Sequence, residues 1–112
     1  MDLQVLNTAL ETELNENLYQ KLVSQLEKDF VMSGITYDFS DLLPEQLVNS
    51  LYEVLEELLS KEYPTLLNLL YRMDIPESAI NFSDETTVEQ QLVNLILRRE
   101  FFKIKLRMKY SS

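Results

Sequence analysis

The side chains best suited to chemistry in this chain are arginines and carboxylates near the ends of two predicted helices. Arg72 and Asp74 follow a run of apolar residues, and a second group occurs at Arg98, Arg99 and Glu100. Arginine and carboxylate groups on neighbouring helices can form paired hydrogen bonds that fix how the helices pack. We therefore predict a structural polar clamp made of Tyr71, Arg72, Asp74, Arg98, Arg99 and Glu100. In the alternative interpretation, Arg72 and either Arg98 or Arg99 bind a small anion or a carboxylate substrate.

Several residue types from which active sites are usually built are missing. The chain contains no His, no Cys and a single glycine, Gly34. Imidazole and thiolate groups are the usual transition-metal ligands, and imidazole is the usual proton shuttle near neutral pH. One glycine cannot build a loop that cradles a phosphate. We therefore predict that the protein is not an enzyme, and we expect no catalytic residue, no metal site, no cofactor and no small-molecule substrate.

The charged residues are unevenly distributed along the chain. The net charge is −9, yet six of the ten basic residues lie within residues 98–112, where Glu100 is the only acid. Such a segment can neutralise the acidic helices of its own fold, or it can bind an acidic partner. The acidic remainder of the chain opposes approach to phosphate. Nucleic acid and an anionic membrane are therefore the less favoured alternatives for this segment.

Length and composition indicate one soluble domain. A chain of 112 residues with 46% hydrophobic residues can bury a single core. We therefore predict one helical domain over residues 1–112. The absence of cysteine fits a reducing compartment, the first ten residues lack the basic residues of a signal peptide, and the apolar runs are too short to span a membrane. We therefore expect a cytoplasmic protein.

Apolar residues recur every three or four positions through most of the chain, which is typical of amphipathic helices. The pattern predicts helices over about 5–32, from a cap at Ser40 or Asp41 through Leu59 with Pro44 in the first turn, over about 65–73, and from Val88 through Arg99. In the first helix, amide and acidic side chains such as Gln25 are expected to face solvent. Gly34 is expected to end that helix. The predicted fold class is all-α, an antiparallel bundle of four main helices.

The last part of the chain allows two structures. Residues 102–110 alternate between apolar and basic side chains, which is typical of a half-buried strand, and residues 35–39 offer a short partner for it. An isolated two-stranded pair is marginally stable in water. We therefore favour a continued helix, with a minor two-stranded pair 35–39/102–110 as the alternative.

A continued helix would carry apolar side chains on two opposite faces. The second face is more than a single contact within a bundle needs, and it comprises Val93, Leu97, Phe101, Ile104 and Met108. An apolar face left open and flanked by charge marks an interface, and the flanking residues here are Lys103, Lys105 and Arg107. We expect an acidic protein partner on this face, with a second copy of the chain as one candidate. The predicted function is a small, non-enzymatic helical interaction module that forms a homodimer or docks on another protein.

One part of the chain resembles a known family. The block Leu-Leu-Tyr-Arg-Met-Asp at 69–74, followed by Ile-Leu-Arg-Arg-Glu at 96–100 and a basic end, resembles small helical proteins of Bacteroidetes-type bacteria. The resemblance covers residues 64–107, and the doubled aromatic Phe101–Phe102 departs from the family pattern. It implies an all-helical bacterial protein and, because the family has no assigned activity, implies no chemistry.

Overall fold

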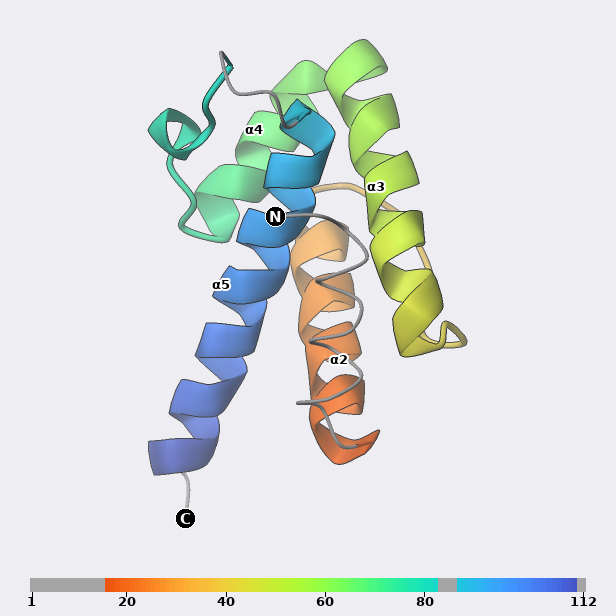
Figure 1. Ribbon diagram of the computed structural model, residues 1–112, viewed down its shortest axis with the longest axis vertical. Helices are drawn as coiled ribbons and strands as arrows, with labels where there is room; N and C mark the ends of the chain where they lie inside the picture. The colour runs from red at the N-terminus through yellow and green to blue at the C-terminus, as the bar shows by residue number, and fades with distance from the viewer. Residues whose placement is uncertain (1–15, 83–86, 111–112) are drawn as a thin grey trace.

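Four α-helices pack against one another in the part of the chain that the computed structural model describes, residues 16–82 and 87–110 (Figure 1). They are α2 (Glu16–Met32), α3 (Pro44–Lys61), α4 (Tyr63–Arg72) and α5 (Val88–Tyr110), with a short 3-10 helix, η1 (Glu77–Ala79), between the last two. These described residues contain no strand. The predicted all-α bundle is therefore confirmed. The predicted first helix is observed from Glu16, while its residues 5–15 lie outside the described ranges.

The last helix, α5, packs against two of the other three helices. It packs against both α2 and α3, while α4 packs against α3 and α2. In Figure 1, α2 lies between α3 and the C-terminal half of α5. This arrangement means that α5 must bury more than one narrow stripe of side chains, because helices cover it from two directions.

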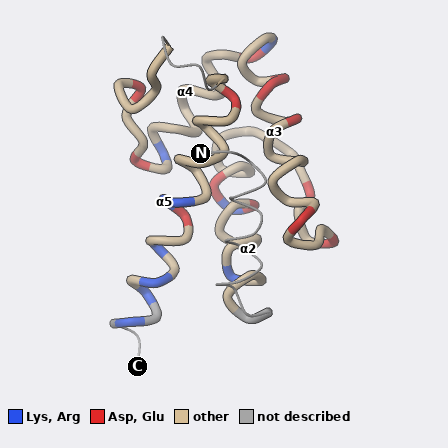
Figure 2. Tube along the Cα trace, in the orientation of Figure 1, with Lys and Arg blue, Asp and Glu red and all other residues tan. Residues whose placement is uncertain are grey.

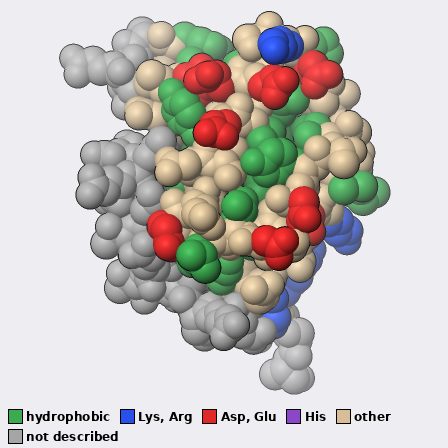
Figure 3. Space-filling model, turned by 90° about the vertical axis from the view of Figure 1, so that its right-hand side faces the viewer, with side chains coloured by type: hydrophobic (Ala, Val, Ile, Leu, Met, Phe, Trp, Pro, Cys, Tyr) green, Lys and Arg blue, Asp and Glu red, His purple; other side chains and the backbone are tan. Residues whose placement is uncertain are grey.

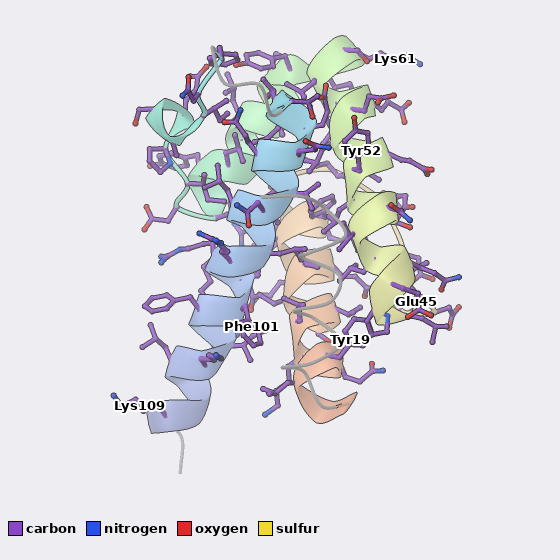
Figure 4. All side chains as sticks on the ribbon, in the orientation of Figure 1. Tyr19, Glu45, Tyr52, Lys61, Phe101 and Lys109 are labelled. Atoms are coloured by element: carbon purple, nitrogen blue, oxygen red, sulfur yellow. The ribbon has the colours of Figure 1, made fainter. Side chains whose placement is uncertain are left out.

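The core is built from the apolar faces of all four helices. Its largest fully buried side chains are Leu22, Leu26, Phe30, Phe39, Leu47, Leu51, Leu55, Leu66, Leu69, Leu70, Met73 and Leu92. The segment after α2 contributes Phe39, whose ring meets that of Phe30 edge to face with centroids 5.1 Å apart. Near the start of α2, Tyr19 projects toward the α3 side of the molecule (Figure 4), and its hydroxyl donates to the Leu42 carbonyl. These two contacts hold the second half of the loop between α2 and α3.

Residues 102–110 are helical, so the alternative two-stranded pair 35–39/102–110 is wrong. Residues 35–39 are extended and place Phe39 in the core without forming a ladder. Continuing the helix keeps the backbone hydrogen bonds of α5 within the segment itself. It also places Arg107 and Lys109 in the last turn, where cations complement the helix dipole.

Two helices end in the same hydrogen-bonded motif, each around a residue with positive φ. After α2, Gly34 has φ 85°, its N–H donates to Val31, and the next N–H, that of Ile35, donates to Phe30. After α4, Asp74 has φ 64°, and the corresponding donors reach Tyr71 and Leu70. These pairs of bonds satisfy carbonyls that a helix end would otherwise leave unpaired. The prediction that Gly34 ends the first helix is confirmed.

The positive φ of Gly34 at the end of α2 allows a direct test of backbone strain. No atom lies within 4 Å of the position that an added Cβ would occupy there, so the cost of a side chain is conformational only. We expect Gly34→Ala to lower the free energy of unfolding by about 1 kcal/mol and Gly34→Asn to lower it by less, because asparagine tolerates this conformation. Urea denaturation measures both, and an alanine variant as stable as the unmodified protein would contradict this account.

Candidate functional site

Two acidic side chains are buried where α2 meets α5. Asp29 of α2 is 4% exposed and Glu100 of α5 is fully buried. Helix periodicity places Glu100 there, because it follows Leu92 and Ile96 at every fourth position and therefore shares their buried face. Buried carboxyl groups are uncommon unless they are paired.

The surrounding side chains form a network around these two acids. Lys103 Nζ lies 3.7 Å from Asp29 Oδ2 and 3.6 Å from Glu100 Oε2. Arg72 Nε lies 3.5 Å from Asp29 Oδ1, and the Gln25 amide donates to Asp29 Oδ2 at 3.2 Å. Contacts from α2, α4 and α5 thus converge on one place. We call the set the buried polar cluster, and its members are Gln25, Asp29, Arg72, Glu100 and Lys103.

The two acids of the cluster have opposite pKa shifts. Burial raises the pKa of Glu100 to about 8, and the neighbouring Asp29 carboxylate adds to that shift. Burial also acts to raise the pKa of Asp29, but hydrogen bonds from Glu100 and Gln25 and the charges of Lys103 and Arg72 outweigh it, so this pKa is lowered. As a carboxylate, Glu100 would have no hydrogen-bond donor among the described residues. The raised pKa predicts instead that Glu100 keeps its proton near neutral pH with Asp29 as the acceptor, so that the pair shares one proton and one negative charge.

The residues predicted to form one clamp are divided between two places. Arg99 lies next to Asp74, with Nη2 3.1 Å from Oδ2, and its Nε donates to the Met73 carbonyl at 3.2 Å. This contact links α5 to the end of α4. Arg72 and Glu100 belong instead to the buried polar cluster, where the acid that pairs with Arg72 is Asp29.

Two of the predicted clamp residues are not part of either contact. Tyr71 is 88% exposed, and Arg98 is also exposed. Including them in the clamp was wrong. Arg98 lies two positions before Glu100, which is about 200° around the helix, so burying the glutamate turns this arginine toward solvent. Tyr71 is turned outward because α4 buries Leu66, Leu69 and Leu70 on its other side.

The predicted interface stripe on α5 is largely core, so the expectation that it forms an open face was wrong. Val93, Leu97 and Ile104 are at most 3% exposed, because helices cover α5 from two directions. Of the other predicted members, Phe101 and Lys103 are half-buried, Lys105 and Arg107 are exposed, and the Met108 side chain lies outside the described part. Among the described side chains of α5, the exposed large apolar ones are instead Phe102 and Leu106, at 52% and 38%.

Sequence reasoning missed Asp29 and placed Gln25 on the solvent face, although Gln25 is only 7% exposed. A signal for both was present. Leu18, Leu22, Gln25 and Asp29 are spaced by four, three and four residues, which is one helix face. Two polar side chains that continue an apolar face indicate a buried polar contact, and the matching acid on α5 is Glu100.

The buried polar cluster can hold a proton, and its composition does not suit a metal ion. Among the described residues, no three His, Cys, Asp or Glu side chains form a group that could hold one. Lys103 and Arg72 already compensate the single negative charge that Asp29 and Glu100 share. The cluster thus fixes the packing of α2 against α5.

Comparison of the chain with protein-family models, with curated proteins and with solved structures finds no match in any of the three. The resemblance to small bacterial helical proteins therefore stays a prediction. No helix within the described ranges combines the length and the apolar composition needed to cross a membrane.

The raised pKa of Glu100 predicts a pH dependence of stability. Between about pH 4.5 and pH 8 the folded chain retains a proton that the unfolded chain has lost, so this group's contribution to stability falls as pH rises through that range. In Glu100→Gln the amide can still donate to Asp29 but cannot ionise. We expect this substitution to reduce the loss of unfolding free energy between pH 5 and pH 8 by roughly 1–3 kcal/mol.

The matched control for this prediction is Glu57→Gln, because Glu57 is an exposed glutamate on α3. Urea denaturation of the three proteins at several pH values separates the local effect from the general repulsion of an acidic chain. If Glu100→Gln and Glu57→Gln show the same pH dependence, then Glu100 is ionised in the folded protein and the shared proton is ruled out. The pKa of Asp29 is lowered in the folded chain, so the ionised form of this group contributes stability. That contribution is lost at more acidic pH, as the pH falls through the lowered pKa.

Proposed function

We propose that this protein is a small helical interaction module that associates with a second copy of itself through the outer face of α5. The observation that carries the proposal is a mixed apolar and basic surface at the C-terminal half of that helix. Residues 98, 102, 105, 106 and 109 fall within about 100° of one another around the helix axis. We call this surface the α5 docking face, and its members are Arg98, Phe102, Lys105, Leu106 and Lys109.

The apolar members of the α5 docking face are large enough to anchor a partner. Phe102 is 52% exposed and Leu106 is 38% exposed, and they lie one helical turn apart. The Arg99 guanidinium carbon lies over the Phe102 ring, 5.8 Å from its centroid, which is a cation–π contact that holds the ring in place. Aromatic side chains surrounded by charge are typical of interface hot spots.

A complementary surface is present on α3 of the same chain. Glu45, Glu53 and Glu56 are exposed and, by helix periodicity, lie on one side of α3 together with the half-buried Tyr52. Figure 3 shows acidic side chains on this side of the molecule with hydrophobic side chains between them. In Figure 2, by contrast, the basic residues are concentrated along the C-terminal half of α5. A second copy therefore supplies the acidic partner that the α5 docking face requires.

The two complementary surfaces lie on different sides of the molecule, which favours exchange between copies. In Figure 4, Lys109 lies at the free end of α5 while Glu45 projects from the far side of α3. A two-fold symmetric dimer would contain the contact between α5 and α3 twice, which closes the assembly. The same acidic α3 surface would be repelled by phosphate, so a self-complementary protein interface is favoured over nucleic acid or an anionic membrane.

We expect the protein to be a dimer in solution and Phe102→Asp to shift it to monomer, because a carboxylate at that position removes the apolar anchor and places a negative charge opposite α3. Sedimentation velocity at about 100 μM, well above the dissociation constant of a specific dimer, measures this. The matched control is Phe82→Asp, since Phe82 is 66% exposed and lies outside α5. Its sedimentation should be unchanged.

A charge exchange tests which surface receives α5. Lys105→Glu and Glu53→Lys should each weaken the dimer, and the chain carrying both changes should recover part of the lost affinity, because attraction is restored at both copies of the contact. A monomeric unmodified protein at about 100 μM would rule out self-association. A dimer that Phe102→Asp leaves unchanged would rule out the α5 docking face.

A further inference from the structure

A basic groove lies beside the buried polar cluster, on residues that the proposed dimer contact does not use. Its volume is about 800 Å³, and its walls come from α2, the end of α4 and α5. Its four cationic lining residues are Lys28, Arg72, Lys103 and Arg107, whereas its acidic lining residues are Asp29 and Asp74. The groove is therefore a locally positive surface in a chain of net charge −9.

Arg72 and Lys103 have only long or weak contacts with acceptors in the described part of the chain, and Arg107 has an uncharged acceptor. Arg72 Nε lies 3.5 Å from Asp29, and its Nη2 is directed at the Met32 sulfur, a weak acceptor. Lys103 Nζ has carboxyl oxygens no nearer than 3.6 Å, which is beyond the usual hydrogen-bond length. Arg107 donates to the uncharged Gln25 amide at 2.7 Å.

The acids near the groove compensate little of this positive charge. Asp74 is paired with Arg99, which leaves Asp29 as the carboxylate facing Arg72 and Lys103. Glu100 is next to Lys103, but its raised pKa keeps it protonated and uncharged near neutral pH. The Ser33 hydroxyl also lines the groove and has no hydrogen-bond partner among the described residues. Cationic and hydroxyl donors thus exceed the acceptors available to them.

The geometry points to a binding site for the phosphate group of a small molecule in the basic groove, held by Arg72, Lys103 and Arg107. A phosphate dianion presents three terminal oxygens in different directions, so it can accept from Arg72 of α4 and from Lys103 and Arg107 of α5 together, whereas a planar carboxylate is best matched by one arginine fork. Of the arginines in the alternative interpretation of the sequence, only Arg72 lines the groove, whereas Arg98 and Arg99 do not.

Isothermal titration of the full chain with pyrophosphate and with inorganic phosphate tests the site. We expect pyrophosphate to bind with a Kd at or below about 1 mM, and added salt to weaken it, as for any charge-assisted contact. Arg72→Gln should weaken binding by at least about tenfold. The matched control is Lys61→Gln, because Lys61 is an exposed cation on α3 outside the groove, and this variant should bind as the unmodified protein does.

A second variant keeps the test independent of folding. If Arg72→Gln does not fold, Arg107→Gln removes an exposed cation of the groove and should also weaken pyrophosphate binding. Absence of binding by the unmodified protein, or equal binding by both groove variants and Lys61→Gln, would overturn the proposal. Citrate provides the carboxylate comparison, and citrate binding as tight as that of pyrophosphate would overturn the assignment to phosphate. Neither Arg72 nor Lys61 belongs to the α5 docking face, so failure here is distinguishable from failure of the dimer.

Discussion

The buried pair Asp29 and Glu100, which the raised pKa of Glu100 predicts to share one proton, is the interaction on which the packing of α2 against α5 depends. Two ionised carboxylates at this depth would repel each other and lack donors, so burial of the second acid requires that it stay protonated. The single remaining charge is then compensated by Lys103 from α5 and Arg72 from α4. Such a polar contact contributes little net stability compared with an apolar pair. It does, however, disfavour any register of α2 against α5 that would leave a charge unpaired.

The same interaction determines what the rest of α5 presents to solvent. With Glu100 turned toward α2, positions two residues away on either side, Arg98 and Phe102, are about 200° around the helix and face outward. The α5 docking face is therefore a geometric consequence of the buried acid. The basic groove has the same origin, because Lys103 and Arg72 are drawn toward Asp29 and bring their remaining donors to its wall.

Much of the fold follows from local sequence rules. Apolar spacing predicts the helices, Pro44 falls in the first turn of α3, and Gly34 follows the end of α2. The Thr87 hydroxyl oxygen accepts a hydrogen bond from the N–H of Gln90, three residues further along, which is the usual geometry of a helix cap. Each of these features depends on neighbours within a few residues, and such features can be predicted without knowing which helices meet.

The candidate site could be predicted only in part, because it depends on long-range packing. The polar blocks at 71–74 and 98–100 are recognisable, yet their partners are decided by rotation of whole helices. Rotation of α5 buries Val93, Leu97 and Ile104 and exposes Phe102, and no local rule distinguishes these two apolar faces. Asp29 was missed because a lone acid on an amphipathic helix usually faces solvent. Only the alignment of Asp29 with Leu22 and Gln25 on one helix face distinguishes it from an acid that faces solvent.

The most direct test of the account is the titration of the two carboxyl carbons by 13C NMR in protein labelled at Asp and Glu side chains. The shared proton predicts that Glu100 titrates with a pKa of about 8, far above its ordinary value of 4.5. It also predicts that Asp29 stays ionised below its ordinary pKa of 3.8. Glu100→Gln identifies the resonance by its loss. A Glu100 carboxyl that is already ionised at pH 6 would contradict the shared proton and, with it, the basis proposed here for the orientation of α5.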